Sequence, residues 1–148
     1  MKQLPAGLPA PDFELPTLDG GAFHLSQALS GGPVVLAFYK AACPTCQFTF
    51  PYLQKSGNSR IWAISQDEPE ETRAFLKHFG IALPVLIDPH PYEVSREYGV
   101  EYVPAVFIIG QDGVIRTSDY GFSKDTLSKI AGHEMFPSDD GIPATRPG

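Results

Sequence analysis

The chain has 148 residues, of which 43% are apolar and 19% are charged, and its net charge is −6. This length and composition predict one globular domain with its own core and exclude a disordered chain. The acidic balance argues against nucleic acid as the main partner, because a phosphate backbone demands a basic surface. No stretch approaches the roughly 20 apolar residues that a membrane span needs.

The N-terminal residues 1–13 contain one lysine but no apolar run, so we do not expect them to be a leader peptide. As the chain stands, we expect a cytoplasmic protein; an exported protein whose leader has been removed is the alternative. Two cysteines cannot build a disulfide framework, and a permanent bridge is not expected in a reducing compartment.

The first elements expected along the chain are a hairpin and a short helix. Residues 13–25 place Asp-Gly-Gly between two short apolar segments, which is typical of a hairpin. Ser26 is the candidate N-cap of the short helix that follows and that ends at Gly31.

Strands and helices then alternate. The expected strands are rich in apolar and β-branched residues: 33–39, 60–65, 84–88, 104–110 and 114–120. The expected helices are 44–55, 67–80, 91–100 and 123–132. This order predicts an α/β domain over residues 1–133, with helices on a mixed central sheet, because the turn at 111–113 adds an antiparallel edge strand. Residues 134–148 are expected to be a flexible tail.

The chain's two cysteines, Cys43 and Cys46, lie where the buried strand 33–39 ends and the helix 44–55 begins. Unpaired N–H groups and the helix dipole favour negative charge there, so the thiolate of Cys43 is stabilised. Cys46 follows on the same face, close enough for a disulfide, and burial keeps its pKa higher. The pair therefore predicts a working dithiol, in which Cys43 attacks and Cys46 resolves the mixed disulfide.

Two other interpretations of the cysteines are weaker. Unrelated buried cysteines are not expected at this spacing and at a strand–helix junction. A zinc site needs about four ligands, but the sequence has no second cysteine pair and its four histidines show no close ligand spacing. We therefore expect no metal, and no cofactor beyond the redox-active Cys43–Cys46 disulfide.

Three segments occur in a fixed order: the entry APDFELPTLDG, the C-P-T-C motif followed by Pro51, and Val103-Pro104 before an apolar strand. In these segments the chain resembles the thioredoxin-like superfamily. More narrowly, it resembles the alkyl hydroperoxide reductase/thiol-specific antioxidant (redoxin) group and the TlpA-like thiol–disulfide oxidoreductases. The resemblance covers about residues 8–131. It implies a thioredoxin-like fold with an N-terminal hairpin extension, and a helix that Pro51 kinks.

The resemblance also implies where a substrate binds. Pro104 is expected to be cis and to face the dithiol, so that the backbone at Val103 pairs with a substrate chain. Pro44 and Thr45, between the cysteines, complete the expected contacts and tune the redox potential. The weaker alternative is that Pro104 is a proline that merely starts a strand.

The chain departs from both families around Cys43. Lys40 and Leu36 stand where peroxiredoxins carry threonine and proline, and Pro104 lies in the region of their arginine. Thr49 replaces the acid that several TlpA-like relatives have after the second cysteine. Lys40 and Glu101 are the charged residues expected to tune the thiols, although each is also compatible with a solvated surface charge.

The sequence thus predicts a thiol–disulfide oxidoreductase that acts on a protein disulfide or dithiol and is reset by an unidentified reductant or oxidant. One alternative is a thiol-dependent peroxidase with antioxidant activity, in which Cys46 resolves a sulfenic acid on Cys43. Another is a binding module whose surface around Pro104 changes when the disulfide forms. The sequence fixes neither the direction of electron flow nor the oligomeric state.

Overall fold

A mixed sheet forms the centre of the domain in the computed structural model, which describes residues 2–137 and 139–148. Its five strands lie in the order β5-β4-β3-β6-β7. Their bounds are β3 Val34–Tyr39, β4 Ile61–Ser65, β5 Val85–Ile87, β6 Ala105–Ile109 and β7 Ile115–Tyr120. Strands β3, β4 and β5 run parallel, whereas β6 and β7 pair antiparallel, so the expected mixed sheet is confirmed.

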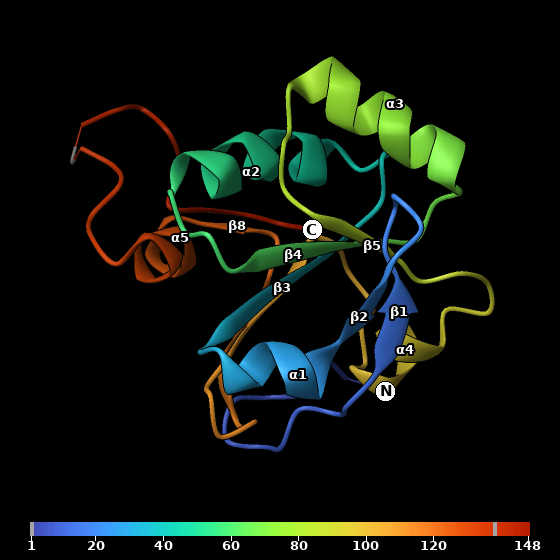
Figure 1. Cartoon of the computed structure of the whole chain (residues 1–148). Coiled ribbons are helices and arrows are strands. Elements are labelled where there is room, and N and C mark those ends of the chain that lie inside the picture. Colours follow the sequence, from blue (N-terminus) through green and yellow to red (C-terminus); the bar gives the residue numbers. More distant parts are fainter. Residues whose placement is uncertain (1, 138) are drawn as a thin grey trace.

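Helices cover both faces of this sheet (Figure 1). Their bounds are α1 Leu25–Ser30, α2 Pro44–Lys55, α3 Pro69–Phe79, α4 Glu93–Glu97 and α5 Lys124–Ala131. Successive side chains of a strand point to opposite faces, and the central strand β3 is buried along its whole length. Val34, Leu36 and Phe38 pack with the α1 and α4 side of the core. Tyr39 and its neighbours on the other face pack against α2, α3 and α5.

The N-terminal hairpin consists of β1 (Glu14–Pro16) and β2 (Ala22–His24), which pair antiparallel as expected. Phe13 and Phe23 bury their rings against the α1 and α4 side of the core. The expected cap of α1 is wrong. His24 is the N-cap residue, and Ser26 lies inside the helix. The carboxylate of Asp12 accepts the N–H of Ser26 at 3.0 Å and so does the work of a capping side chain.

Other helix ends follow the sequence closely. Gly80 ends α3 in the left-handed conformation, with φ at 64°, as a C-terminal glycine commonly does. Ser123 caps α5, since its hydroxyl accepts the N–H of Thr126 at 3.2 Å. The expected helix at 91–100 is shorter than predicted, because α4 covers Glu93–Glu97. In the part of the chain that the structure describes, no helix has the length and apolar character to cross a bilayer.

The C-terminal segment, residues 134–148, packs on the domain in its described part. Phe136 is buried, and the ammonium of Lys124 lies 2.7 Å from the carboxylate of Asp140. Further on, β9 (Thr145–Arg146) pairs antiparallel with β8 (Phe122–Ser123). The flexibility of this segment stays a prediction, and these are the contacts that it would break on moving.

Candidate active site

Cys43 lies at the junction of β3 and α2, as the sequence predicts. It is the N-cap residue of α2, with φ at −80° and ψ at 116°, and Pro44 follows at the first helical position. Proline favours this extended conformation in the residue before it and lacks the N–H that would be unpaired there. The sulfur of Cys43 accepts the N–H of Cys46 at 3.2 Å, so the helix terminus points a backbone donor at this thiol.

The two thiols lie in unlike surroundings. Cys43 is half-buried, whereas Cys46 has none of its surface exposed. Both are free thiols. Burial raises the pKa of Cys46, and its interaction with the Cys43 thiol acts in the same direction. Cys43 is therefore the thiol that a substrate can reach, and Cys46 is the one that gives up its proton with difficulty.

The loop before β6 meets the dithiol. The peptide bond between Val103 and Pro104 is cis, as the resemblance implied. The thiol of Cys43 donates to the carbonyl oxygen of Val103 at 3.3 Å. Thr45 joins the same region, because its hydroxyl donates to the carbonyl oxygen of Pro147 at 2.7 Å. Pro44 is exposed beside them. The structure thus places Cys43 against Val103, and Thr45 against Pro147.

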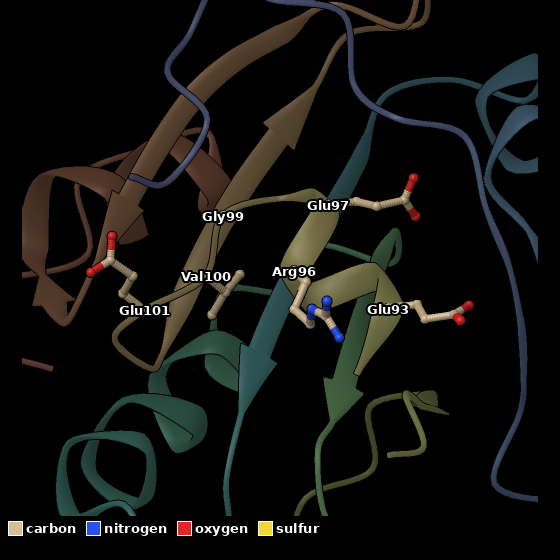
Figure 2. A pocket seen from close by; sticks show the side chains of 6 residues that line it. All are labelled: Glu93, Arg96, Glu97, Gly99, Val100 and Glu101. Carbon is tan, nitrogen blue, oxygen red and sulfur yellow. The ribbon is translucent and has the colours of Figure 1, made fainter. Parts of the chain in front are cut away.

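The two charged residues expected to tune the thiols lie at the surface. Lys40 is exposed, and its carbonyl oxygen accepts the N–H of Cys43 at 3.2 Å. Glu101 is also exposed. It lies at one side of a groove that α4 borders, and Figure 2 shows it across that groove from Glu93 and Glu97. A tuning role for either residue stays a prediction.

Asp67 is a site residue that the sequence reasoning missed. Its carboxylate accepts the N–H of Ala41 at 2.7 Å, which ties the loop before Cys43 to the end of β4. Its charge also raises the pKa of Cys46, after burial and the Cys43 thiol. The sequence does carry a signal for Asp67, because this residue lies two positions after the end of β4. Strand β4 runs parallel to β3, and the carboxyl ends of parallel strands meet at one edge of the sheet.

Two buried hydroxyls lie near Cys46 without a hydrogen-bond partner among the described residues, those of Tyr39 and Thr49. Thr49 occupies the position where an acid was expected from the TlpA-like relatives. Burial also raises the pKa of Tyr39. The surroundings of Cys46 thus contain uncharged hydroxyls as well as apolar side chains, and Asp67 acts on this thiol through its charge.

A mixed sheet, a C-x-x-C pair at the start of α2 and a cis-proline opposite it define a thioredoxin-like redoxin domain. Solved structures agree. A candidate protein disulfide isomerase from Bacteroides thetaiotaomicron superposes with a TM-score of 0.79 at 23% identity, over 89% of this chain and 91% of that one. A candidate thiol:disulfide interchange protein DsbE from Chlorobium tepidum gives a TM-score of 0.74 at 27% identity, over 87% and 94%.

The sequence then identifies the family. Residues 6–118 match the AhpC/TSA family, and the chain belongs to it. Among curated proteins, the thiol-disulfide oxidoreductase ResA of Geobacillus thermodenitrificans is 32% identical over 118 residues, which are 74% of this chain and 66% of ResA. The chain thus spans slightly less than two thirds of that relative. The redoxin and TlpA-like resemblance and the thioredoxin-like fold are both confirmed.

Proposed function

We propose that the chain is a thiol–disulfide oxidoreductase in which Cys43 exchanges disulfides with a protein substrate. The observation that carries this proposal is the difference in solvent exposure between the two thiols. Cys43 is half-buried at the helix terminus, and Cys46 is 0% exposed. A half-exposed thiol at a helix N-terminus suits a nucleophile, and an enclosed neighbour suits a resolving thiol. The name of the relative ResA supports the same activity.

In the proposed first step, the Cys43 thiolate attacks one sulfur of the substrate disulfide. The substrate S–S bond breaks, and its other sulfur leaves as a thiolate that takes up a proton. Cys46 then loses its proton and attacks the Cys43 sulfur, so the second substrate sulfur leaves in the same way. Two electrons pass from the dithiol to the substrate, and a Cys43–Cys46 disulfide remains. The reverse steps oxidise a substrate dithiol.

The protein's own groups assist both steps. The N–H of Cys46 points at the Cys43 sulfur and stabilises negative charge on it. The Val103 carbonyl oxygen contacts the same sulfur, so a substrate backbone held at Val103 lies beside the reacting atom. An external reductant or oxidant resets the dithiol after each cycle.

A peroxidase is the second candidate, because the chain belongs to the AhpC/TSA family. Peroxide reduction at Cys43 would need groups that bind and polarise the peroxide. Lys40 is exposed and Leu36 is fully buried at the positions where peroxiredoxins have threonine and proline. The groups that hydrogen-bond the Cys43 sulfur are the Cys46 N–H and the Val103 carbonyl. We therefore rank disulfide exchange first.

The test compares Cys46→Ser with Cys43→Ser on a peptide disulfide. We expect the Cys46→Ser variant to accumulate a mixed disulfide with the peptide, seen by mass spectrometry, and the Cys43→Ser variant to form none. A mixed disulfide on the Cys43→Ser variant would assign the roles the other way round. If neither change affected turnover, the mechanism would be wrong.

A stopped-flow measurement separates the rivals. The reduced protein is mixed with hydrogen peroxide, while Trp62 fluorescence and thiol loss are followed. A reaction no faster than that of an ordinary thiol supports disulfide exchange. A reaction orders of magnitude faster favours the peroxidase. Failure to turn over either oxidant, together with redox-dependent capture of a partner, would favour the binding module.

A further inference from the structure

The last four residues of the sequence, 145–148, form what we call the covering segment, because they lie against the face of the domain that carries Cys43. Its strand β9 adds to the edge of β8, with Arg146 opposite Phe122 and Thr145 opposite Ser123. In Figure 1 the red end of the chain runs along β8 to a point below α2. The chain thus supplies an extended peptide to its own sheet edge.

The covering segment contacts both parts of the predicted substrate site. The hydroxyl of Thr45 donates to the carbonyl oxygen of Pro147 at 2.7 Å. A Cβ added to Gly148 would lie 2.7 Å from the carbonyl oxygen of Val103, and that oxygen is 3.3 Å from the Cys43 sulfur. Gly148 therefore lies next to the nucleophile.

Gly121 lets the covering segment approach this closely. Its φ of 79° is unfavourable for other residues, and a Cβ there would collide with the carbonyl oxygen of Arg146. Beyond this backbone fit, one side chain of the segment makes a specific contact. The guanidinium of Arg146 lies over the ring of Phe48, 4.4 Å from its centroid, which is a cation–π arrangement.

An extended substrate peptide would use the same groups. Strand addition to a sheet edge binds through backbone hydrogen bonds and tolerates many sequences, while pockets for single side chains give selectivity. A second chain cannot pair with Phe122 and Ser123 while β9 holds those positions. The net charge of −6 adds a general attraction for cationic partners.

We infer that the covering segment occupies the docking site of the substrate polypeptide, and that the substrate is an extended segment with a cationic side chain over Phe48 and a cysteine near the place of Gly148. This inference rests on the proposed function. Gly148 has no sulfur, so the covering segment fills the site without reacting. It must leave before a substrate docks.

A cross-linking experiment tests the placement alone. In a Cys46→Ser background, the Gly148→Cys variant is treated with oxidised glutathione, which first forms a mixed disulfide with one thiol. The second thiol then displaces glutathione. We expect an intramolecular disulfide between residues 43 and 148. The matched control is Ser59→Cys, at an exposed position beyond the far end of α2, and it should give none. The added Cβ would meet the Val103 carbonyl oxygen at 2.7 Å, so the chain end must shift slightly to admit it. A disulfide that forms as fast in the control variant overturns the placement.

A rate comparison tests the competition. The Arg146→Ala variant should be alkylated by iodoacetamide at Cys43 about two- to fivefold faster than the parent chain, as expected for the loss of one surface cation–π contact. Arg116→Ala removes an equally charged side chain that pairs with Asp112 instead, and it should react like the parent. Unchanged alkylation of Arg146→Ala, or equal acceleration of Arg116→Ala, contradicts the inference.

The substrate preference is tested with two peptide disulfides, which carry arginine or glutamate two residues before the cysteine. We expect the arginine peptide to exchange faster, and added salt to reduce the difference; equal rates would overturn the preference for a cation. If neither peptide exchanges, the proposed function fails, yet the alkylation rates and the cross-link still decide whether the segment covers Cys43.

Discussion

Replacing Phe136 by alanine tests whether the C-terminal segment packs on the domain in solution. Phe136 is 8% exposed, and its ring centroid lies 5.2 Å from that of Tyr52 and 5.9 Å from that of Phe122. The ammonium of Lys124 stands over the same ring at 5.3 Å. This ring is the main apolar anchor of the segment.

The expected loss follows from this environment. Truncating a buried phenylalanine to alanine costs about 3–5 kcal/mol when the cavity stays empty. The segment lies at the surface, so it can settle partly into the space, and we expect the free energy of unfolding to fall by about 2–3 kcal/mol. A phenylalanine on a freely mobile tail would contribute within about 0.5 kcal/mol.

Urea unfolding of both chains measures the difference, provided that the dependence on denaturant stays the same. Leu8→Ala is the control, since Leu8 is a large apolar residue that is 43% exposed and should cost little. A loss below about 0.5 kcal/mol for Phe136→Ala would show that the segment does not pack as described, and it would also remove the support for the covering segment.

Three further predictions each concern the side chain of one residue. Tyr98→Phe removes a buried hydroxyl that donates to a backbone carbonyl at 2.7 Å, and urea unfolding should show a loss of about 1–2 kcal/mol. Asp67→Asn removes a charge that raises the pKa of Cys46, so the rate of mixed-disulfide resolution should rise at a lower pH than in the parent; an unchanged pH profile would contradict this. Hydrogen bonds, from Lys124 first, hold the pKa of Asp140 below its ordinary 3.8. The contact therefore stabilises the fold above pH 3.8 and is lost as the pH falls through the lowered pKa of Asp140. An NMR pH titration of the backbone amide that donates to the Asp140 carboxylate should detect this loss.

The sequence was most informative where one segment determines its own structure. The apolar run at 33–39, the proline after Cys43 and the glycine after α3 each carry a local pattern, and the structure has β3, α2 and the end of α3 in those places. The prediction for the cap of α1 failed because the acceptor at the start of this helix, the carboxylate of Asp12, lies outside the helix and accepts the N–H of Ser26.

The parts that could not be predicted depend on contacts between distant segments. The covering segment meets Thr45 and Val103 through its backbone, and backbone groups carry no sequence pattern. Its composition, rich in proline, glycine and polar residues, is equally typical of a loose tail. Asp67 was missed for a related reason, because its role depends on how β4 aligns beside β3.

The surroundings of Cys46 explain why a cover over Cys43 would matter. Cys46 is enclosed, and burial raises its pKa, so its attack on a mixed disulfide waits for the loss of a proton that few groups nearby can accept. The hydroxyls of Tyr39 and Thr49 are poor bases, and the charge of Asp67 raises the pKa of Cys46 further. On the proposed mechanism, we therefore expect resolution by Cys46 to be slower than the attack by Cys43. Substrates then have to be selected before Cys43 reacts. The covering segment would provide this selection, because only a peptide that binds the same groups more tightly would displace it from Cys43.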